Sequence, residues 1–263
     1  MDYEAIRLTV APTGVARLTF INAARGNPIN ARLCSELSEA AIEVSENKAV
    51  RCLLIDAEGA AFSYGGDISS FIADLDELPR NIKRWTTTIH SAIARFQRMD
   101  APVVSAVQGV CAGGMAAFIA GSDIVVAASN ARFVAAYAGI GFSCDAGSSI
   151  MFTRRMGLSR ARRYLLLNET LSADVALGTG LVDEVVAPEN LFGRASQIAA
   201  EFAAGPTLAY GEMRRLLLSA ESQPLETQLE LEAQALARSS ATADARGALT
   251  AFAESRKPSF KGM

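Results

Sequence analysis

Short apolar runs alternate with longer stretches of helical periodicity along the first half of the chain. The short runs predict strands at residues 3–10, 15–21, 51–57, 103–107 and 123–128. Thr13 and Gly14 lie between the first two runs and predict a turn, and therefore a hairpin. Apolar positions three and four residues apart predict helices over 31–47 and 80–99, and Pro102 ends the second. Apolar strands joined by helical crossovers predict an α/β core whose sheet is covered on both faces.

From about residue 145 onward the pattern is almost entirely helical. Ser172 is a favoured N-cap residue for the helix in ADVALGTG, which Gly178 or Gly180 would end. A short extended piece is predicted at 182–186. Prolines then separate three helical segments, at Pro188, Pro206 and Pro224.

The C-terminal helical segments are rich in leucine. These leucines are Leu216, Leu217, Leu218, Leu225, Leu229, Leu231 and Leu236. A helical region this apolar is expected to pack on the core or on another subunit, because large exposed apolar patches usually mark interfaces. We therefore expect a core over residues 1–200 and a C-terminal helical region over residues 201–263.

Composition narrows the class of protein. Half of the 263 residues are hydrophobic, which suits one large domain, or one domain with a small appendage. No uncharged stretch of about 18 apolar residues occurs, so no membrane span is expected. The opening MDYEAIRLTV lacks the order of a secretion signal, and a cytoplasmic location is expected. The net charge is −3 with scattered basic residues, which argues against a nucleic-acid partner.

Cysteine and histidine usage argues against a metal site. Cys34, Cys52, Cys111 and Cys144 form no C-x-x-C pair, and His90 is the single histidine. Free thiols in a reducing compartment are the expected state. A Cys–His nucleophile pair would need His90, which lies in the middle of a predicted helix and is better interpreted as a structural or exposed residue.

Two loops with adjacent glycines each follow a predicted buried strand. The first is Ser63-Tyr64-Gly65-Gly66-Asp67 and the second is Gly109-Val110-Cys111-Ala112-Gly113-Gly114. Neither matches the dinucleotide fingerprint or the phosphate loop, so phosphate binding is poorly supported. Glycine lets backbone N–H groups approach a ligand, and each loop leads into a predicted helix with a positive dipole end. Two such amides aimed at one oxygen would form an oxyanion hole, although two plain structural turns are the alternative.

The segments AAFSYGGDI (60–68) and AVQGVCAGGMAA (106–117) closely resemble the two signature segments of the crotonase superfamily, the enoyl-CoA hydratase/isomerase family. The resemblance continues through 131–149, 171–186 and 252–262, in the same order along the chain. It implies a spiral of ββα units followed by a helical trimerisation region, and hence a homotrimer or a dimer of trimers. It also implies an acyl-CoA substrate, with CoA as part of that substrate and no separate cofactor.

The resemblance also assigns site residues. It places the oxyanion amides on Gly66 and Gly114. Residues matching those that contact CoA are Ser63, Tyr64, Asp67, Ile68, Phe252 and Lys257. Five arginines on one helical stretch could lie near a CoA phosphate, but a solvated helix face is the preferred interpretation. They are Arg154, Arg155, Arg160, Arg162 and Arg163.

Two departures from the family pattern affect the chemistry. Family hydratases carry two glutamates that position and activate water, and the matching positions here are Ala117 and Tyr137. Water addition is therefore not expected. Tyr137 could orient the acyl chain, hydrogen-bond an intermediate or simply form a pocket wall.

Asp145 lies eight residues beyond Tyr137, where some family members place a catalytic Asp, and Cys144 stands where a Pro often precedes it. A single base there suits isomerisation of a double bond. Capping of the following helix by Asp145 is an equally open interpretation. Thioester hydrolysis, dehalogenation, C–C cleavage and a decayed acyl-CoA-binding protein remain alternatives.

Overall fold

The computed structural model describes residues 3–263, and its core is a six-stranded sheet in the order β1-β2-β3-β4-β6-β9. The strands are β1 (Ile6–Val10), β2 (Val15–Phe20), β3 (Cys52–Ala57), β4 (Val103–Val107), β6 (Ile124–Ala128) and β9 (Glu184–Val186). β1 and β2 form the expected antiparallel hairpin, and Gly14 turns the chain with a φ of 89°. All the other neighbours in this sheet are parallel.

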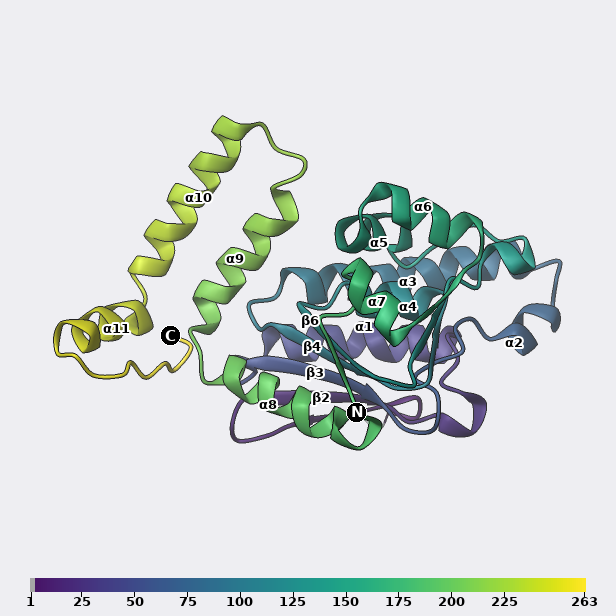
Figure 1. The fold of residues 1–263 in the computed structure, drawn as a ribbon, viewed down its shortest axis with the longest axis horizontal. Coiled ribbons are helices and arrows are strands. Elements are labelled where there is room, and N and C mark those ends of the chain that lie inside the picture. Colours follow the sequence, from purple (N-terminus) through teal and green to yellow (C-terminus); the bar gives the residue numbers. More distant parts are fainter. Residues whose placement is uncertain (1–2) are drawn as a thin grey trace.

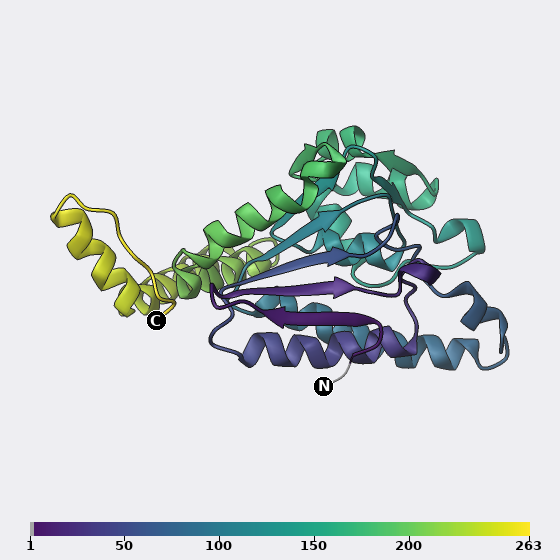
Figure 2. The ribbon, with the colours of Figure 1, turned by 90° about the horizontal axis from the view of Figure 1, so that it is seen from below.

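Helices cover both faces of this sheet, as the apolar strands predicted. Alternate residues of a strand point to opposite faces, so Leu53 and Ile55 of β3 join one apolar cluster while Leu54 joins another. The first cluster includes α1 (Ala31–Glu46), α3 (Leu78–Arg98) and α4 (Gly114–Ala120), and the second includes α8 (Leu191–Ala203). Figure 2 shows α1 running along one face, below the strands.

A second, three-stranded sheet lies beside the main one. It contains β5 (Val110–Ala112), β7 (Arg132–Val134) and β8 (Thr170–Ser172). The remaining helices of this half are α2 (Ile68–Ile72), α5 (Ser148–Met156), α6 (Leu158–Leu166) and α7 (Ala173–Thr179), with short 3-10 turns η1 (Ala23–Arg25), η2 (Ala138–Ile140) and η3 (Pro188–Asn190). Ser172 caps α7 by accepting a hydrogen bond from the Val175 amide, and Gly180 ends that helix in the left-handed conformation, as predicted.

Three C-terminal helices extend away from this core (Figure 1). They are α9 (Thr207–Ser219), α10 (Leu225–Ser240) and α11 (Ala243–Ala253). Arg214 fastens α9 to the core, because its buried guanidinium donates to the carbonyls of Phe96 and Ala101 and pairs with Asp123 at 2.9 Å. Within residues 3–263, no helix combines the length and the apolar character needed to cross a membrane.

Candidate active site

The two glycine loops are joined by backbone hydrogen bonds. The Ser63 amide donates to the Val110 carbonyl, and the Ala112 amide donates to the Ser63 carbonyl, both at 3.0 Å. The Asp67 amide donates to the Ile29 carbonyl at 2.9 Å, which anchors the first loop on its other side. These bonds bring the loops together on the wall of one cavity of about 280 Å³, which Gly66 and Gly114 both line.

The amides of Gly66 and Gly114 are available to a ligand. Gly114 is the first residue of α4, so its amide has no partner inside the helix and lies at the positive end of the helix dipole. The Gly66 amide donates to no other group in the part of the chain that the structure describes. A Cβ on Gly66 would lie 2.7 Å from the Phe71 ring, and one on Gly114 would lie 3.2 Å from Ile29, so both positions favour glycine.

Asp145 points into this cavity beside Gly114. Its Oδ1 atom would lie 3.3 Å from a Cβ on Gly114, and Asp145 is the one carboxylate among the described residues that line the cavity. Asp145 does not cap the following helix: α5 begins at Ser148, and its N-cap residue Gly147 provides no side-chain hydrogen bond. The capping interpretation of Asp145 is therefore wrong.

Tyr137 holds the Asp145 carboxylate in place. Its hydroxyl donates to Asp145 Oδ1 at 2.8 Å and lies 3.0 Å from Ser148 Oγ. Burial, together with the negative charge on Asp145, raises the pKa of Tyr137 well above its ordinary value, so the phenol stays protonated and remains a donor. Tyr137 is thus more than a wall of the cavity, because it fixes the orientation of the neighbouring acid.

His90 supports the same segment from α3. Its Nε2 atom accepts a hydrogen bond from the Ala146 amide at 3.1 Å. Ala146 has a φ of 51° and Gly147 a φ of 82°, so two consecutive left-handed residues turn the chain just after Asp145. Left-handed backbone is costly for alanine, and this hydrogen bond helps to keep Ala146 in it.

Among the described residues that line the cavity, no side chain besides Asp145 is a carboxylate, an imidazole or an amine. Ala117, which the resemblance matched to the first hydratase glutamate, is fully buried in α4 and does not line the cavity. Cys34 lines the cavity from α1, but burial, with a smaller contribution from the charge on Asp145, raises the pKa of its thiol to about 12. The thiol is therefore protonated at neutral pH and is not an activated nucleophile.

The other residues of the first loop divide into two groups. Tyr64 and Ile68 line the cavity and are 60% and 49% exposed, so they lie at its mouth. Ser63 is fully buried instead, where its hydroxyl donates to the Asn27 carbonyl at 2.7 Å and accepts from the Gly65 amide at 3.0 Å. Ser63 thus shapes the loop rather than the cavity surface.

Asp67 is likewise buried and fully engaged with protein groups. It pairs with Arg25 at 2.8 Å and accepts a hydrogen bond from the Ser69 hydroxyl. Burial alone would raise the pKa of Asp67, but hydrogen bonds from Ser69, Ser70 and Asn30 outweigh it and lower the pKa to about 2. Asp67 therefore braces the loop as a carboxylate at neutral pH.

Phe252 and Lys257 lie outside this cavity in the single chain. Phe252 belongs to α11 and is 84% exposed, and Lys257 follows it in the exposed C-terminal segment. Figure 1 shows α11 at the opposite end of the molecule from α2, which borders the cavity. One chain alone therefore does not bring these two residues to Gly66 and Gly114.

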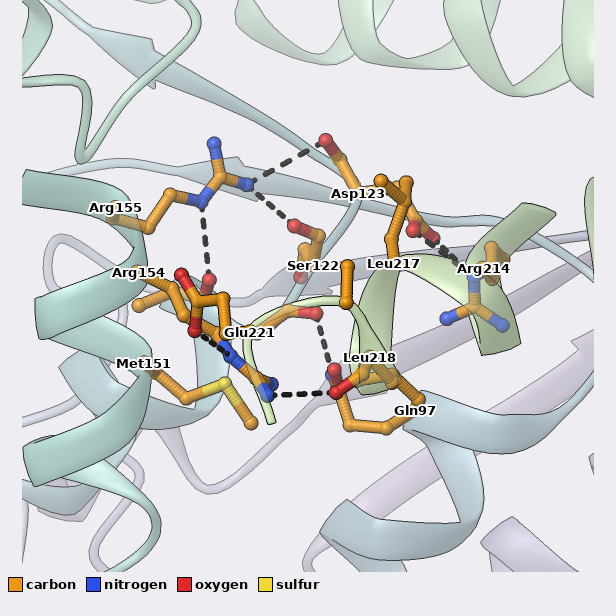
Figure 3. A pocket seen from close by; sticks show the side chains of 13 residues that line it. Gln97, Ser122, Asp123, Met151, Arg154, Arg155, Arg214, Leu217, Leu218 and Glu221 are labelled. Carbon is orange, nitrogen blue, oxygen red and sulfur yellow. Dashed lines mark hydrogen bonds and ion pairs between the residues drawn. The ribbon is translucent and has the colours of Figure 1, made fainter. Parts of the chain in front are cut away.

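A second hollow of about 400 Å³ lies between α9 and the α4–α5 region (Figure 3). Its arginines are already paired: Arg154 with Glu221 at 3.2 Å and Arg155 with Asp183 at 2.9 Å. Farther along the same helical stretch, Arg160 and Arg163 both pair with Glu169. The expected solvated helix face is therefore largely an ion-paired surface, which leaves little free positive charge for a phosphate.

Comparison with known proteins identifies the family and the fold. The sequence model of the family described as enoyl-CoA hydratase/isomerase matches residues 11–263. The chain is 33% identical to the 1,2-epoxyphenylacetyl-CoA isomerase of Escherichia coli (strain K12), over 95% of each chain, and 30% identical to a 4-chlorobenzoyl coenzyme A dehalogenase-2 of Arthrobacter sp, over 84% and 80% of the two chains. The crystal structure of an enoyl-CoA hydratase from Polaromonas sp. JS666 superposes on this chain with a TM-score of 0.92 at 28% identity. The superposition covers 98% of this chain and 100% of the hydratase chain.

The chain therefore belongs to the enoyl-CoA hydratase/isomerase family of the crotonase superfamily, and its fold is the crotonase fold.

Proposed function

We propose that this protein isomerises an enoyl-CoA by stabilising the thioester enolate at Gly66 and Gly114 while Asp145 moves a proton. The observation that carries the proposal is the position of Asp145: its carboxylate lies beside Gly114 and is the only acid among the described residues that line the cavity. A thioester oxygen held by both amides would bring its α and γ carbons toward this carboxylate.

The proton transfer needs only one base. Asp145 takes a proton from the α or γ carbon of the acyl group. The electron pair of that C–H bond forms a new carbon–carbon double bond, and the π pair of the carbonyl moves onto the thioester oxygen. The two amides stabilise this charge, which is the role of an oxyanion hole. The protonated carboxyl then returns the proton to the other carbon, so one C–H bond breaks, one forms and the double bond shifts. Because Tyr137 occupies Oδ1, the Oδ2 atom is left for the substrate.

Water addition finds less support. It requires a group that holds and deprotonates water on one face of the alkene. Ala117 has no polar atom in its side chain, and Tyr137 is a protonated donor to Asp145. Neither can take the place of the family glutamates.

Nucleophilic attack by Asp145 is the second candidate. Carboxylates form covalent intermediates in several enzyme classes. The dehalogenase of Arthrobacter sp among the relatives favours this candidate over hydrolysis or C–C cleavage. Release of halide from a halogenated acyl-CoA, without double-bond migration in an enoyl-CoA, would select it.

Assembly belongs to the same proposal. Several leucines on α9, α10 and α11 are more than half exposed in the single chain, namely Leu217, Leu225, Leu229, Leu236 and Leu249. We propose that they are covered in a homotrimer or a dimer of trimers. Phe252 and Lys257 would then meet CoA only from a neighbouring subunit. The four free cysteines suit the cytoplasmic location that the sequence led us to expect.

The decisive experiment follows an enoyl-CoA in D₂O and measures three products at once: the shifted double bond, deuterium at the α and γ carbons, and the hydrated product. The wild type is expected to shift the double bond and exchange protons without adding water. Asp145→Asn should lose about 10²–10⁴-fold in exchange, which is the usual cost of removing a general base. Asp174→Asn, on the exposed first turn of α7, is the matched control. Robust hydration by the wild type, or unchanged exchange in a folded Asp145→Asn variant, would overturn the proposal.

A further inference from the structure

Three aromatic rings form a stack on the wall of the acyl cavity. Phe71 from α2 stacks on Trp85 from α3 and on Phe142, which follows η2, and all three residues line the cavity. The Phe71 and Trp85 centroids are 6.0 Å apart with an interplanar angle of 19°, and the Phe71 and Phe142 centroids are 5.8 Å apart with an angle of 25°. Phe71 is therefore stacked against each of the other two rings, and this part of the wall is aromatic.

The stack begins at the oxyanion hole. The tip of the Phe71 ring lies against Gly66, since a Cβ there would lie 2.7 Å from the Phe71 Cζ atom. An acyl group whose thioester oxygen is bound by Gly66 must therefore pass along the face or edge of this ring. The neighbouring wall is apolar, with Ile29 near the glycines and Ile89 in the deeply buried part.

We propose that the cavity selects thioesters of planar aromatic acids, with the acyl ring packed against the Phe71, Trp85 and Phe142 rings. This inference rests on the proposed function and names its substrate class. Aromatic rings gain about 0.5–1.5 kcal/mol from offset or edge contacts beyond the area they bury, which corresponds to roughly a two- to twelvefold preference. A flexible alkyl chain makes no such contact and also loses rotamer freedom in a cavity of about 280 Å³.

The test compares three CoA thioesters with equal numbers of acyl carbons: phenylacetyl-CoA, cyclohexylacetyl-CoA and octanoyl-CoA. Trp85 is the only tryptophan of the chain, so its fluorescence reports binding from within the stack. The wild type is expected to bind phenylacetyl-CoA about three- to tenfold more tightly than either other thioester. Cyclohexylacetyl-CoA distinguishes the effect of a planar ring on binding from the effect of ring size, because its ring is of similar size but is not planar.

Phe71→Leu and Phe142→Leu remove one ring each and keep the wall apolar. Each is expected to reduce the preference for phenylacetyl-CoA over cyclohexylacetyl-CoA to less than about twofold. Phe192→Leu is the matched control, since Phe192 lies on α8 at the other face of the sheet and should keep the wild-type preference. Thermal unfolding of each variant establishes that it folds. If a variant does not fold, the comparison of the three thioesters in the wild type still tests the substrate class.

Equal binding of the three thioesters by the wild type would overturn the substrate class. Deuterium exchange at the α carbon, measured on the same three compounds, separates this failure from that of the proposed function. Exchange that depends on Asp145 but is indifferent to the acyl group leaves the proposed chemistry in place and refutes only the aromatic preference. Absence of binding for all three would refute the substrate class, whereas the proposed chemistry fails only if an enoyl-CoA also shows no exchange that depends on Asp145.

Discussion

The Tyr137 hydroxyl donates a 2.8 Å hydrogen bond to Oδ1 of Asp145, across eight residues of chain. The resemblance to the family matched Tyr137 to a glutamate, and in the structure its hydroxyl serves the neighbouring acid. The bond holds the carboxylate beside Gly114 and leaves its second oxygen for a substrate. Tyr137 therefore positions the carboxylate that we propose as the base.

Replacement of Tyr137 by Phe tests this relationship. The change keeps the ring and removes the donor, so the carboxylate gains rotational freedom. We expect kcat for α-carbon exchange to fall by about 10- to 150-fold with little change in KM, because hydrogen bonds to charged groups contribute about 1.5–3 kcal/mol. Steady-state exchange kinetics measured by mass spectrometry provide both constants.

Tyr164→Phe is the control for that experiment. The Tyr164 hydroxyl is buried and has no hydrogen-bond partner among the described residues, so its removal should not weaken folding or exchange. A Tyr137→Phe variant with wild-type kcat would show that the hydrogen bond to Asp145 has no role in catalysis.

The His90–Ala146 bond makes a second prediction about the same segment. His90→Leu removes the acceptor for the Ala146 amide and keeps an apolar side chain, whereas His90→Gln offers Oε1 at a distance along the side chain similar to that of Nε2. We expect kcat for exchange to fall about three- to tenfold in His90→Leu and to recover largely in His90→Gln, with KM little changed in both. Equal losses in the two variants would contradict a role for the acceptor.

The tautomer of His90 can be determined by NMR, independently of the exchange kinetics. It is the single histidine, so its ring nitrogens give one set of NMR signals. An Nε2 atom that accepts from the Ala146 amide requires the neutral ring to carry its proton on Nδ1. Nitrogen shifts that place the proton on Nε2 would show that the bond is absent in solution.

The pattern of apolar residues predicted the main sheet and its long helices because their periods repeat over five or more residues. Strand 15–21 and helix 31–47 end within a residue of β2 and α1. The second sheet was missed, since three residues such as Val110–Ala112 are too few to show an alternation. The strand predicted at 182–186 is only Glu184–Val186 in the structure, and its bounds were misplaced because three residues show no clear alternation.

The site was only partly predictable. Glycine doublets after buried strands indicated the two loops, and the loops do meet on one cavity. The burial of Ser63 and Asp67, which stabilise the loop through contacts inside the protein, could not be predicted from the sequence. A signature segment does not distinguish residues that contact a ligand from those that shape the loop. The contact between His90 and Ala146 joins segments 56 residues apart, and no local pattern encodes it.

The low pKa of Asp67 predicts an acid-dependent contribution to stability. Its folded-state pKa, about 2, lies below the ordinary value of 3.8, so the folded state favours the carboxylate. The resulting stabilisation is fully present above about pH 4 and is lost as the pH falls toward 2. Asp67→Asn should therefore reduce the free energy of unfolding by about 1–2 kcal/mol at pH 7, and the difference from wild type should shrink below pH 4. Urea unfolding at several pH values measures this, and a difference independent of pH would contradict it.

The leucine-rich face of the C-terminal helices predicts how the protein assembles. Leu229 and Leu236 on α10 are 54% and 72% exposed in the single chain, and they lie seven residues apart on a helix that projects from the core. The wild type should scatter light as a trimer or a hexamer at micromolar concentration. The double variant Leu229→Glu and Leu236→Glu should dissociate it, because the interface would then bury unpaired charges. Thr227→Glu adds one charge at an exposed position of the same helix and should leave the assembly intact. A monomeric wild type would refute the interface, whereas a double variant that stays a trimer would place the interface on another face.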